Sequence, residues 1–205
     1  MAEPTEPSGR DDRPVFLLGL MGAGKSSVGR ALAARRGAVF IDLDQRVEAI
    51  FGRSIPALFE QGGEAYFRRL ERASLRSLLA EPGFAGSRAV VATGGGVIVD
   101  PRNLDDMRAL GTTIYLEVGL PALTSRLRED AERGRRPLLA PPPPDPAHSP
   151  PPLDPLAARL ASLLADREQA YRGADLVIDG AAELSAVCAR IEAALAEADE
   201  GRTPA

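Results

Sequence analysis

One short segment constrains the fold and chemistry of this chain more than any other feature. The sequence GLMGAGKS, residues 19–26, directly follows the apolar run Val15–Leu18 and directly precedes a helix-forming stretch. In that context the pattern GxxxxGK[ST] predicts a loop whose backbone N–H groups surround a phosphate. Lys25 is the only lysine in a chain that otherwise uses arginine, and it lies in this loop. Because a compact ammonium binds phosphate as a point charge, its placement supports this interpretation.

The expected nucleotide contacts come from the phosphate-binding loop, residues 19–26, and from the first turn of the helix that follows it. Lys25 is expected to reach the β- and γ-phosphates, and the Ser26 hydroxyl to ligate Mg²⁺. The helix that begins here adds positive potential for the phosphates. We expect nucleotide contacts from Gly22, Ala23, Gly24, Lys25, Ser26 and Ser27.

Apolar runs alternate with helical periodicity along the rest of the chain. Near-continuously apolar strands that alternate with helices predict a parallel sheet covered on both faces. We therefore expect an α/β fold of three layers, with a five-stranded parallel sheet and helices on both faces. The expected strands are 15–18, 38–41, 89–93, 113–118 and 175–178, and the expected helices are 26–36, 44–51, 63–80, a helix after Pro101, 121–132 and 183–198.

Length and composition bound the remaining possibilities. The 205 residues, 44% of them hydrophobic, predict a single domain at 14–198 between a disordered leader, 1–13, and a disordered tail, 199–205. A formal net charge of −4 argues against a nucleic-acid partner, and no apolar run reaches the roughly 18 residues of a membrane span. A polar N-terminus and a single cysteine favour the cytoplasm. We expect a monomer.

One segment departs from the alternating pattern. Residues 137–155 hold 10 of the chain's 18 prolines. Proline lacks the amide hydrogen that a helix interior or a central strand needs, so neither is expected here. This composition predicts an extended, polyproline-like loop on the surface.

Two classes of nucleotide-binding protein fit the sequence poorly. A GTPase needs a second lysine in an Asn-Lys-x-Asp motif, and the chain has none. Motor and AAA-type ATPases usually carry an apolar strand that ends in Asp-Glu, whereas AVVAT is followed here by GGG. A small kinase remains, and its acceptor should bind just after the strands. Asp42, Asp44 and Gly94–Gly96 occupy such positions.

Six motifs taken together resemble the shikimate kinases. The resemblance runs from about Val15 to Ile191, in the order and spacing of that family. It implies a nucleoside-monophosphate-kinase-like fold with a mobile lid at about 134–155, which carries the proline-rich insert. It also implies ATP-dependent phosphorylation of the 3-hydroxyl of shikimate to shikimate 3-phosphate and ADP, in the synthesis of chorismate and aromatic amino acids. The motifs are GLMGAGKSSVGR, DLD at 42–44, FRRLE at 67–71, ATGGG at 92–96, RRPLL at 135–139, and Arg167 followed by Tyr171.

The resemblance also implies roles for individual residues. Asp44 is the candidate base, Lys25 and Arg136 stabilise the transferring phosphoryl group, and Asp42 lies near Mg²⁺. Arg136 belongs to the lid and contacts ATP as well. Substrate binding is assigned to Asp44, to Arg68 and Arg167 on the carboxylate, and to the backbone of Gly94, Gly95 and Gly96.

These roles agree with the chemistry of such an acceptor. Guanidinium groups bind a carboxylate in pairs of hydrogen bonds, and glycines allow a close approach of backbone to ligand. Glu71 lies one helical turn from Arg68 and is expected to orient it. Arg128 is a further candidate, for covering the adenine.

Other interpretations remain open from the sequence alone. A kinase of the same fold that acts on gluconate or on a nucleotide would also use arginine and aspartate. A catalytically silent nucleotide-binding module could dock a partner through the proline-rich segment. Single residues also have structural alternatives: Asp44 as a helix cap, Asp42 as a residue of structural importance alone, Arg68 and Arg167 as surface charges, and Gly94–Gly96 as a turn.

Overall fold

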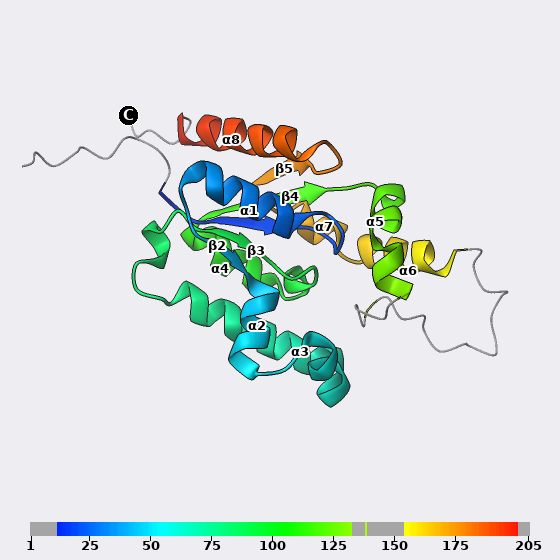
Figure 1. Ribbon diagram of the computed structural model, residues 1–205. Coiled ribbons are helices and arrows are strands. Elements are labelled where there is room, and N and C mark those ends of the chain that lie inside the picture. Colours follow the sequence, from blue (N-terminus) through cyan, green and yellow to red (C-terminus); the bar gives the residue numbers. More distant parts are fainter. Residues whose placement is uncertain (1–11, 133–137, 139–153, 201–205) are drawn as a thin grey trace, which may run out of the picture.

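Five parallel strands form the centre of the molecule. The computed structural model describes residues 12–132, 138 and 154–200 (Figure 1). Within these residues the sheet has the order β2-β3-β1-β4-β5, and every neighbouring pair is parallel. The expected α/β fold with a five-stranded parallel sheet is therefore confirmed. The strands are β1 Val15–Leu18, β2 Phe40–Asp42, β3 Val90–Ala92, β4 Thr112–Glu117 and β5 Leu176–Asp179.

The central strand β1 is the most deeply buried. All four of its side chains are 0% exposed. Val15 lies level with Val90 in β3 and with Thr112 in β4. A strand buried on both faces must be apolar throughout, which explains why VFLL shows no alternation. Burial of each such side chain contributes roughly 1.5–3 kcal/mol relative to exposure.

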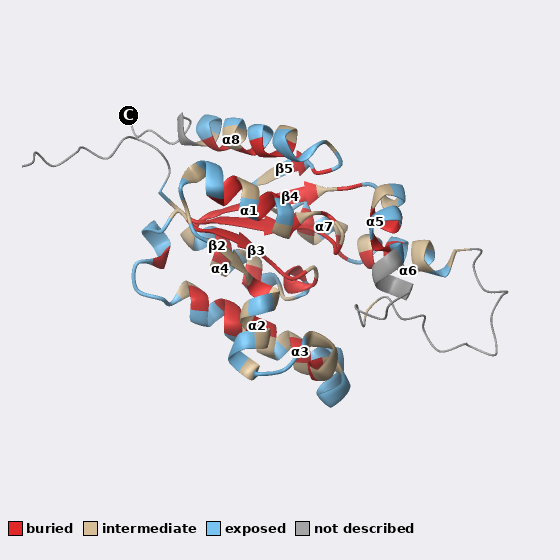
Figure 2. Ribbon diagram, in the orientation of Figure 1, coloured by how far each residue is buried: buried red, intermediate tan, exposed pale blue. Residues whose placement is uncertain are grey.

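Helices cover both faces of the sheet. α1 packs against α8 on one face, while α4 and the later part of α3 pack on the other (Figure 1). Figure 2 shows that the inner strands β1, β3 and β4 are buried and that the outer faces of α3 and α8 are exposed. The helices are α1 Lys25–Arg36, α2 Leu43–Phe51, α3 Ile55–Leu79, α4 Pro101–Leu110, α5 Leu120–Glu132, α6 Pro155–Ala165, α7 Glu168–Tyr171 and α8 Leu184–Glu200, with short 3₁₀ turns at Phe84–Gly86 and Val97–Val99.

Helix α3 begins earlier than the sequence predicts. Ser54 accepts a hydrogen bond from the Ala57 amide, and Pro56 lies in the first turn, so the helix starts at Ile55. Gly63, with φ 70° and ψ −173°, interrupts the helical conformation. The expected start at residue 63 therefore marks a break inside a longer element.

A second difference concerns α6. The expectation that 137–155 contains no helical residue is wrong at Leu138, which lies in a 3₁₀ turn, and at Pro155, which opens α6. Neither α6 nor α7 is among the helices expected from the sequence. Proline is tolerated at the first position of α6, since the first amide of a helix has no partner inside the helix. Asp154 caps this helix by accepting a hydrogen bond from the Ala157 amide at 3.0 Å.

The ends and the lid lie largely outside the described residues. Residues 1–11, 133–137, 139–153 and 201–205 are not described, so the disordered leader, the lid and the disordered tail stay predictions. At the edges of the described part, the Asp12 carbonyl accepts a hydrogen bond from Arg88, and α8 extends to Glu200. No described helix is long and apolar enough to cross a bilayer.

Candidate active site

Three loops meet at the carboxyl edge of the sheet. The phosphate-binding loop follows β1, Asp42 ends β2, and Gly94–Gly96 follow β3. Because β3 lies between β2 and β1, these loops are neighbours. This is the edge where open parallel sheets bind their ligands.

The phosphate-binding loop needs glycine at two positions for different reasons. Gly22 has φ 81°, and a Cβ there would lie 2.8 Å from Cγ of Leu127 in α5. Gly24 has φ 90°, caps α1, and offers no side chain to the first amides of the helix. The first turn, residues 25–27, carries no acidic side chain. The loop and the helix start therefore present backbone N–H groups and positive potential to an anion.

Lys25 is held inside this loop. Its Nζ donates hydrogen bonds to the carbonyls of Gly19, at 2.7 Å, and Leu20, at 3.1 Å. The side chain is buried and lines a cavity of about 340 Å³, which we call the phosphate cavity. The phosphate cavity is lined by Met21, Gly22, Gly24, Lys25, Ser26, Ser27, Asp42, Asp44, Thr93, Gly95, Arg126 and Leu127.

Asp42 serves both the fold and the site. Its Oδ1 accepts hydrogen bonds from the amides of Asp44 and Gln45, so Asp42, and not Asp44, caps α2. Its Oδ2 accepts a hydrogen bond from Ser26 Oγ at 2.8 Å. A hydroxyl and a carboxylate oxygen are thus adjacent in the phosphate cavity. This pair fits Mg²⁺, which in phosphate-transfer sites takes few protein oxygens together with phosphate and water.

Asp44 lies where two cavities meet. It lines the phosphate cavity and also a second cavity of about 350 Å³, the acceptor cavity. A Cβ on Gly94 would lie 2.8 Å from Asp44 Oδ1 and 2.2 Å from Glu71 Oε1, so a side chain at 94 would displace both carboxylates. The acceptor cavity is lined by Met21, Asp44, Glu48, Ile55, Pro56, Phe59, Phe67, Arg68, Glu71, Gly94, Gly95, Gly96 and Leu138.

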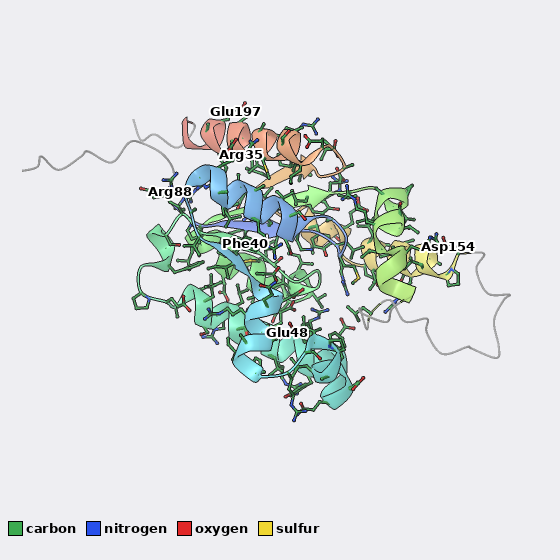
Figure 3. All side chains as sticks on the ribbon, viewed as in Figure 1. Arg35, Phe40, Glu48, Arg88, Asp154 and Glu197 are labelled. Carbon is green, nitrogen blue, oxygen red and sulfur yellow. The ribbon has the colours of Figure 1, made fainter. Side chains whose placement is uncertain are left out.

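Helices α2 and α3 form the outer wall of the acceptor cavity. α2 and the first part of α3 extend away from the sheet, as Figure 1 shows. Glu48 of α2, labelled in Figure 3, accepts a hydrogen bond from the Ile55 amide at 2.9 Å, which ties the two helices together. Phe59 and Phe67 stack at 4.6 Å between ring centroids and make this wall apolar.

Arg68 is fixed by two carboxylates of its own helix. Nη1 donates to Glu71 Oε2 at 2.6 Å, and Nη2 donates to Glu64 Oε1 at 3.0 Å. A Cβ on Gly96 would lie 2.1 Å from Arg68 Nη2, so glycine at 96 makes room for the guanidinium. Arg68 is half-buried at the cavity wall, so its assignment as a solvated surface charge does not hold.

Glu71 is the most deeply buried carboxylate of the site. Its side chain is 1% exposed, and its Oε1 has no hydrogen-bond partner among the described residues. Burial raises the pKa of Glu71, and the nearby charge of Asp44 adds to this, while Arg68 opposes it. Because Glu71 is buried and its Oε2 accepts a hydrogen bond from Arg68 Nη1, it orients Arg68, as the one-turn spacing predicts.

Arg167 reaches the same site from the start of α7. It is 5% exposed, and its Nη1 donates to the Gly95 carbonyl at 3.3 Å. The Tyr171 hydroxyl donates to the same carbonyl. Burial raises the pKa of Tyr171, which keeps this hydroxyl protonated as a donor. Gly95 lines both cavities, so Arg167 and Tyr171 hold the wall between them.

Two arginines of α5 have different partners, and only Arg128 is a candidate from the sequence. Arg128 forms an ion pair with Asp154 at 2.9 Å, on the side of α6. Arg126 instead donates to the Gly22 carbonyl at 3.2 Å and lines the phosphate cavity. Arg136 lies outside the described residues, although Leu138, two positions later, lines the acceptor cavity.

The site combines a phosphate-binding loop, an adjoining cavity lined by Arg68 with Arg167 behind its Gly95 wall, and an aspartate between the two cavities. These are the parts that a small-molecule kinase needs. Comparison with known proteins narrows the class. The family model "Shikimate kinase" matches residues 21–196. This chain belongs to the shikimate kinase family.

Individual relatives agree with the family match. The chain is 46% identical to the shikimate kinase of Xanthomonas axonopodis pv. citri over 58% of its own length and 63% of the relative's. It is 43% identical to that of Geobacter sulfurreducens over 83% of each chain. A solved shikimate kinase from Acinetobacter baumannii in complex with shikimate superposes with a TM-score of 0.75 at 29% identity, covering 90% of this chain and 94% of that one. A gluconokinase from Sinorhizobium meliloti 1021, at 18% identity and a TM-score of 0.55, shares the fold alone.

Proposed function

We propose that this protein transfers the γ-phosphoryl group of ATP to the 3-hydroxyl of shikimate, giving shikimate 3-phosphate and ADP, on the route to chorismate and aromatic amino acids. The observation that carries this function is the position of Asp44, which lines both cavities at once. On one side lie Lys25 and the phosphate-binding loop, and on the other lies Arg68. A phosphate donor in one cavity and a carboxylate-bearing acceptor in the other would therefore both contact Asp44.

The acceptor side matches the chemistry of shikimate. Its carboxylate would bind the guanidinium groups of Arg68 and Arg167, since charge-assisted pairs of this kind are the strongest hydrogen bonds that side chains offer. Its hydroxyls would face Asp44, an acceptor of hydrogen bonds. Gly94 and Gly96 leave room for the side chains of Asp44 and Arg68, so that both groups can face a ligand in this cavity.

Transfer requires alignment and charge neutralisation more than covalent help. The acceptor oxygen attacks the γ-phosphorus, the bond from that phosphorus to the oxygen bridging it to the β-phosphorus breaks, and the hydroxyl proton passes to Asp44. Lys25 and the amides of the loop hold the phosphates. Mg²⁺ held by Ser26 and Asp42 would neutralise phosphate charge. We assign Arg136 to the transferring phosphoryl group, because Leu138 of the same motif lines the acceptor cavity.

Further assignments follow from the same proposal. We propose that the enzyme acts as a monomer and in the cytoplasm, to which its single cysteine is suited. Its net charge of −4 gives no basis for binding nucleic acid.

An ADP-release assay with several acceptors tests the function. Shikimate should support turnover that depends on ATP and Mg²⁺, whereas gluconate and nucleoside monophosphates should not. Phosphorus NMR of the product should show a single phosphomonoester at the 3-position. Turnover with gluconate or a nucleotide in place of shikimate would contradict the proposal, and so would ATP binding without turnover of any acceptor.

A further inference from the structure

A side-chain carboxylate lies between the two arginines of the acceptor site. Glu64 Oε1 accepts hydrogen bonds from Arg68 Nη2, at 3.0 Å, and Nε, at 3.3 Å. The same oxygen lies 3.7 Å from Arg167 Nη2. Glu64 is therefore the group through which these two guanidinium groups are joined, although they come from α3 and from the start of α7.

The three contacts use other nitrogens of the guanidinium groups than those that bind Glu71 and the Gly95 carbonyl. Arg68 Nη1 donates a hydrogen bond to Glu71, and Glu71 is held in place because its carboxylate is only 1% exposed. Arg167 gives Nη1 to the Gly95 carbonyl. Glu64 faces the Nε–Nη2 edge of Arg68 and the Nη2 of Arg167.

A substrate carboxylate would need the same edges. Guanidinium groups recognise carboxylates through such paired N–H donors, and two carboxylates brought to one set of donors repel each other. Arg68 and Arg167 are 16% and 6% exposed at their side chains, so little of their surface is left for a second anion. Binding of the substrate carboxylate thus competes with Glu64.

Glu64 is placed so that it can move away. Its side chain is 44% exposed, unlike that of Glu71. It directly follows Gly63, whose non-helical conformation interrupts α3. Rotation at this break carries Glu64 toward solvent without disrupting a continuous run of helical hydrogen bonds.

We propose that Glu64 is an exchangeable carboxylate, which occupies the binding edges of Arg68 and Arg167 and is displaced by the carboxylate of the substrate. This inference rests on the proposed function. Before the substrate binds, Glu64 keeps the two guanidinium groups aligned and compensates their positive charge. It also favours acceptors that carry a carboxylate, because a neutral acceptor cannot replace the ion pairs that the arginines lose when Glu64 leaves. The cost is a weaker affinity for the correct substrate.

Calorimetric titration of Glu64→Gln and Glu64→Ala with shikimate tests the exchange. Removal of the competing charge should tighten shikimate binding by about twofold to fivefold, the range expected for a partly exposed ion pair. The methyl ester of shikimate, which has no charged carboxylate, should bind the variants and the wild type equally weakly. Glu60→Gln is the matched control: Glu60 lies on α3 one turn before Glu64, on the other side of the Gly63 break, is exposed, and makes no ion pair with either arginine among the described residues. It should leave both affinities unchanged.

The outcomes separate this inference from the proposed function. Weaker or unchanged shikimate binding in both Glu64 variants, with wild-type binding intact, overturns the exchange and leaves the kinase function standing. An equal gain for shikimate and its methyl ester also overturns it, because the competition must depend on charge. Absence of shikimate binding in the wild type and in both variants overturns the proposed function and the exchange together.

Discussion

Ser26 donates its hydroxyl hydrogen to one oxygen of Asp42, while the other oxygen of Asp42 caps α2. The cap fixes the rotation of the carboxylate, so that Oδ2 faces the phosphate cavity. A helix cap and a metal ligand are thus compatible in one side chain, because a carboxylate has two oxygens.

The first prediction follows from this pair. Ser26→Ala and Asp42→Asn should each raise the Mg²⁺ concentration needed for half-maximal activity by about tenfold, because the first removes one of the two proposed oxygen ligands and the second removes the negative charge of the other. Activity should be titrated against Mg²⁺ at saturating ATP and shikimate. Asp100→Asn is the control, since Asp100 also caps a helix, α4, but lies away from the phosphate cavity. An unchanged Mg²⁺ requirement in both site variants would exclude the pair as the metal site.

The second prediction concerns Asp44. Asp44→Asn keeps the shape of the side chain but removes the charge and the proton acceptor. We expect kcat to fall by about 10²-fold or more, the contribution typical of a general base, while the affinity for shikimate changes little. Steady-state kinetics and a binding titration measure the two effects separately. A variant that retains most of its kcat would show that Asp44 only binds the acceptor.

The third prediction concerns recognition of the carboxylate. Arg68→Ala and Arg167→Ala should each lower kcat/KM for shikimate by about tenfold to a hundredfold, since hydrogen bonds to charged groups contribute about 1.5–3 kcal/mol. The KM for ATP should barely change. Arg69→Ala is the control, because Arg69 is exposed and lies over the Tyr66 ring instead of in the acceptor cavity. Equal losses for ATP and shikimate would indicate a damaged fold.

The sequence predicts the parts of the site that depend on local chemistry. The phosphate-binding loop is specified by three glycines and Lys25 within eight residues, and β1 by four consecutive apolar side chains. Asp42 and Asp44 follow the same strand, but the sequence does not show which one caps α2. That choice depends on the backbone conformation at Asp42, which is extended, with φ −101° and ψ 115°.

The sequence does not predict contacts that arise from tertiary packing. About a hundred residues of chain separate Glu64 from Arg167, and they meet because the turn Val97–Val99 packs against both α3 and α7. Glycines at 62 and 63 indicate a helix boundary, so the earlier part of α3 is not expected from the pattern. Arg126 and Arg128 lie two positions apart on α5 and therefore face different neighbours, a distinction that composition cannot make.

The fourth prediction concerns Tyr171, which is buried and stacked on Tyr115 at 5.0 Å. Tyr171→Phe keeps the stack but removes the hydroxyl that donates to the Gly95 carbonyl. The KM for shikimate should rise by about threefold to tenfold, the range for one neutral hydrogen bond, because Arg167 shares that carbonyl. The KM for ATP should stay within twofold. Tyr115→Phe removes a hydroxyl from the other ring of the same stack and serves as the control; the same kinetic change in both variants would assign the effect to the stack.

The last prediction concerns the dependence of stability on pH. Asp175, just before β5, accepts hydrogen bonds from the amide and hydroxyl of Thr113, at 2.9 and 2.7 Å, and from Arg108, at 2.9 Å. Burial alone would raise the pKa of Asp175, but these hydrogen bonds and the charge of Arg108 outweigh it, so that the pKa is lowered. A lowered pKa means that the folded state binds this proton less readily than the unfolded state. The contribution of Asp175 to stability is therefore fully present above the unfolded pKa, about 3.9, and is lost as the pH falls through the folded value.

Asp175→Asn cannot ionise and tests this relation. At pH 7 the variant should unfold about 2–6 °C below the wild type, because it loses charge-assisted hydrogen bonds between β4 and β5. The difference between the two unfolding temperatures should shrink as the pH is lowered below about 4, where the wild-type carboxylate also becomes neutral. Asp105→Asn, at an exposed position on α4, should follow the wild type throughout. Thermal unfolding followed by circular dichroism from pH 7 to pH 3 gives the comparison. A difference between wild type and Asp175→Asn that stays constant over this range would show that the charge of Asp175 does not contribute, and that the variant acts through packing alone.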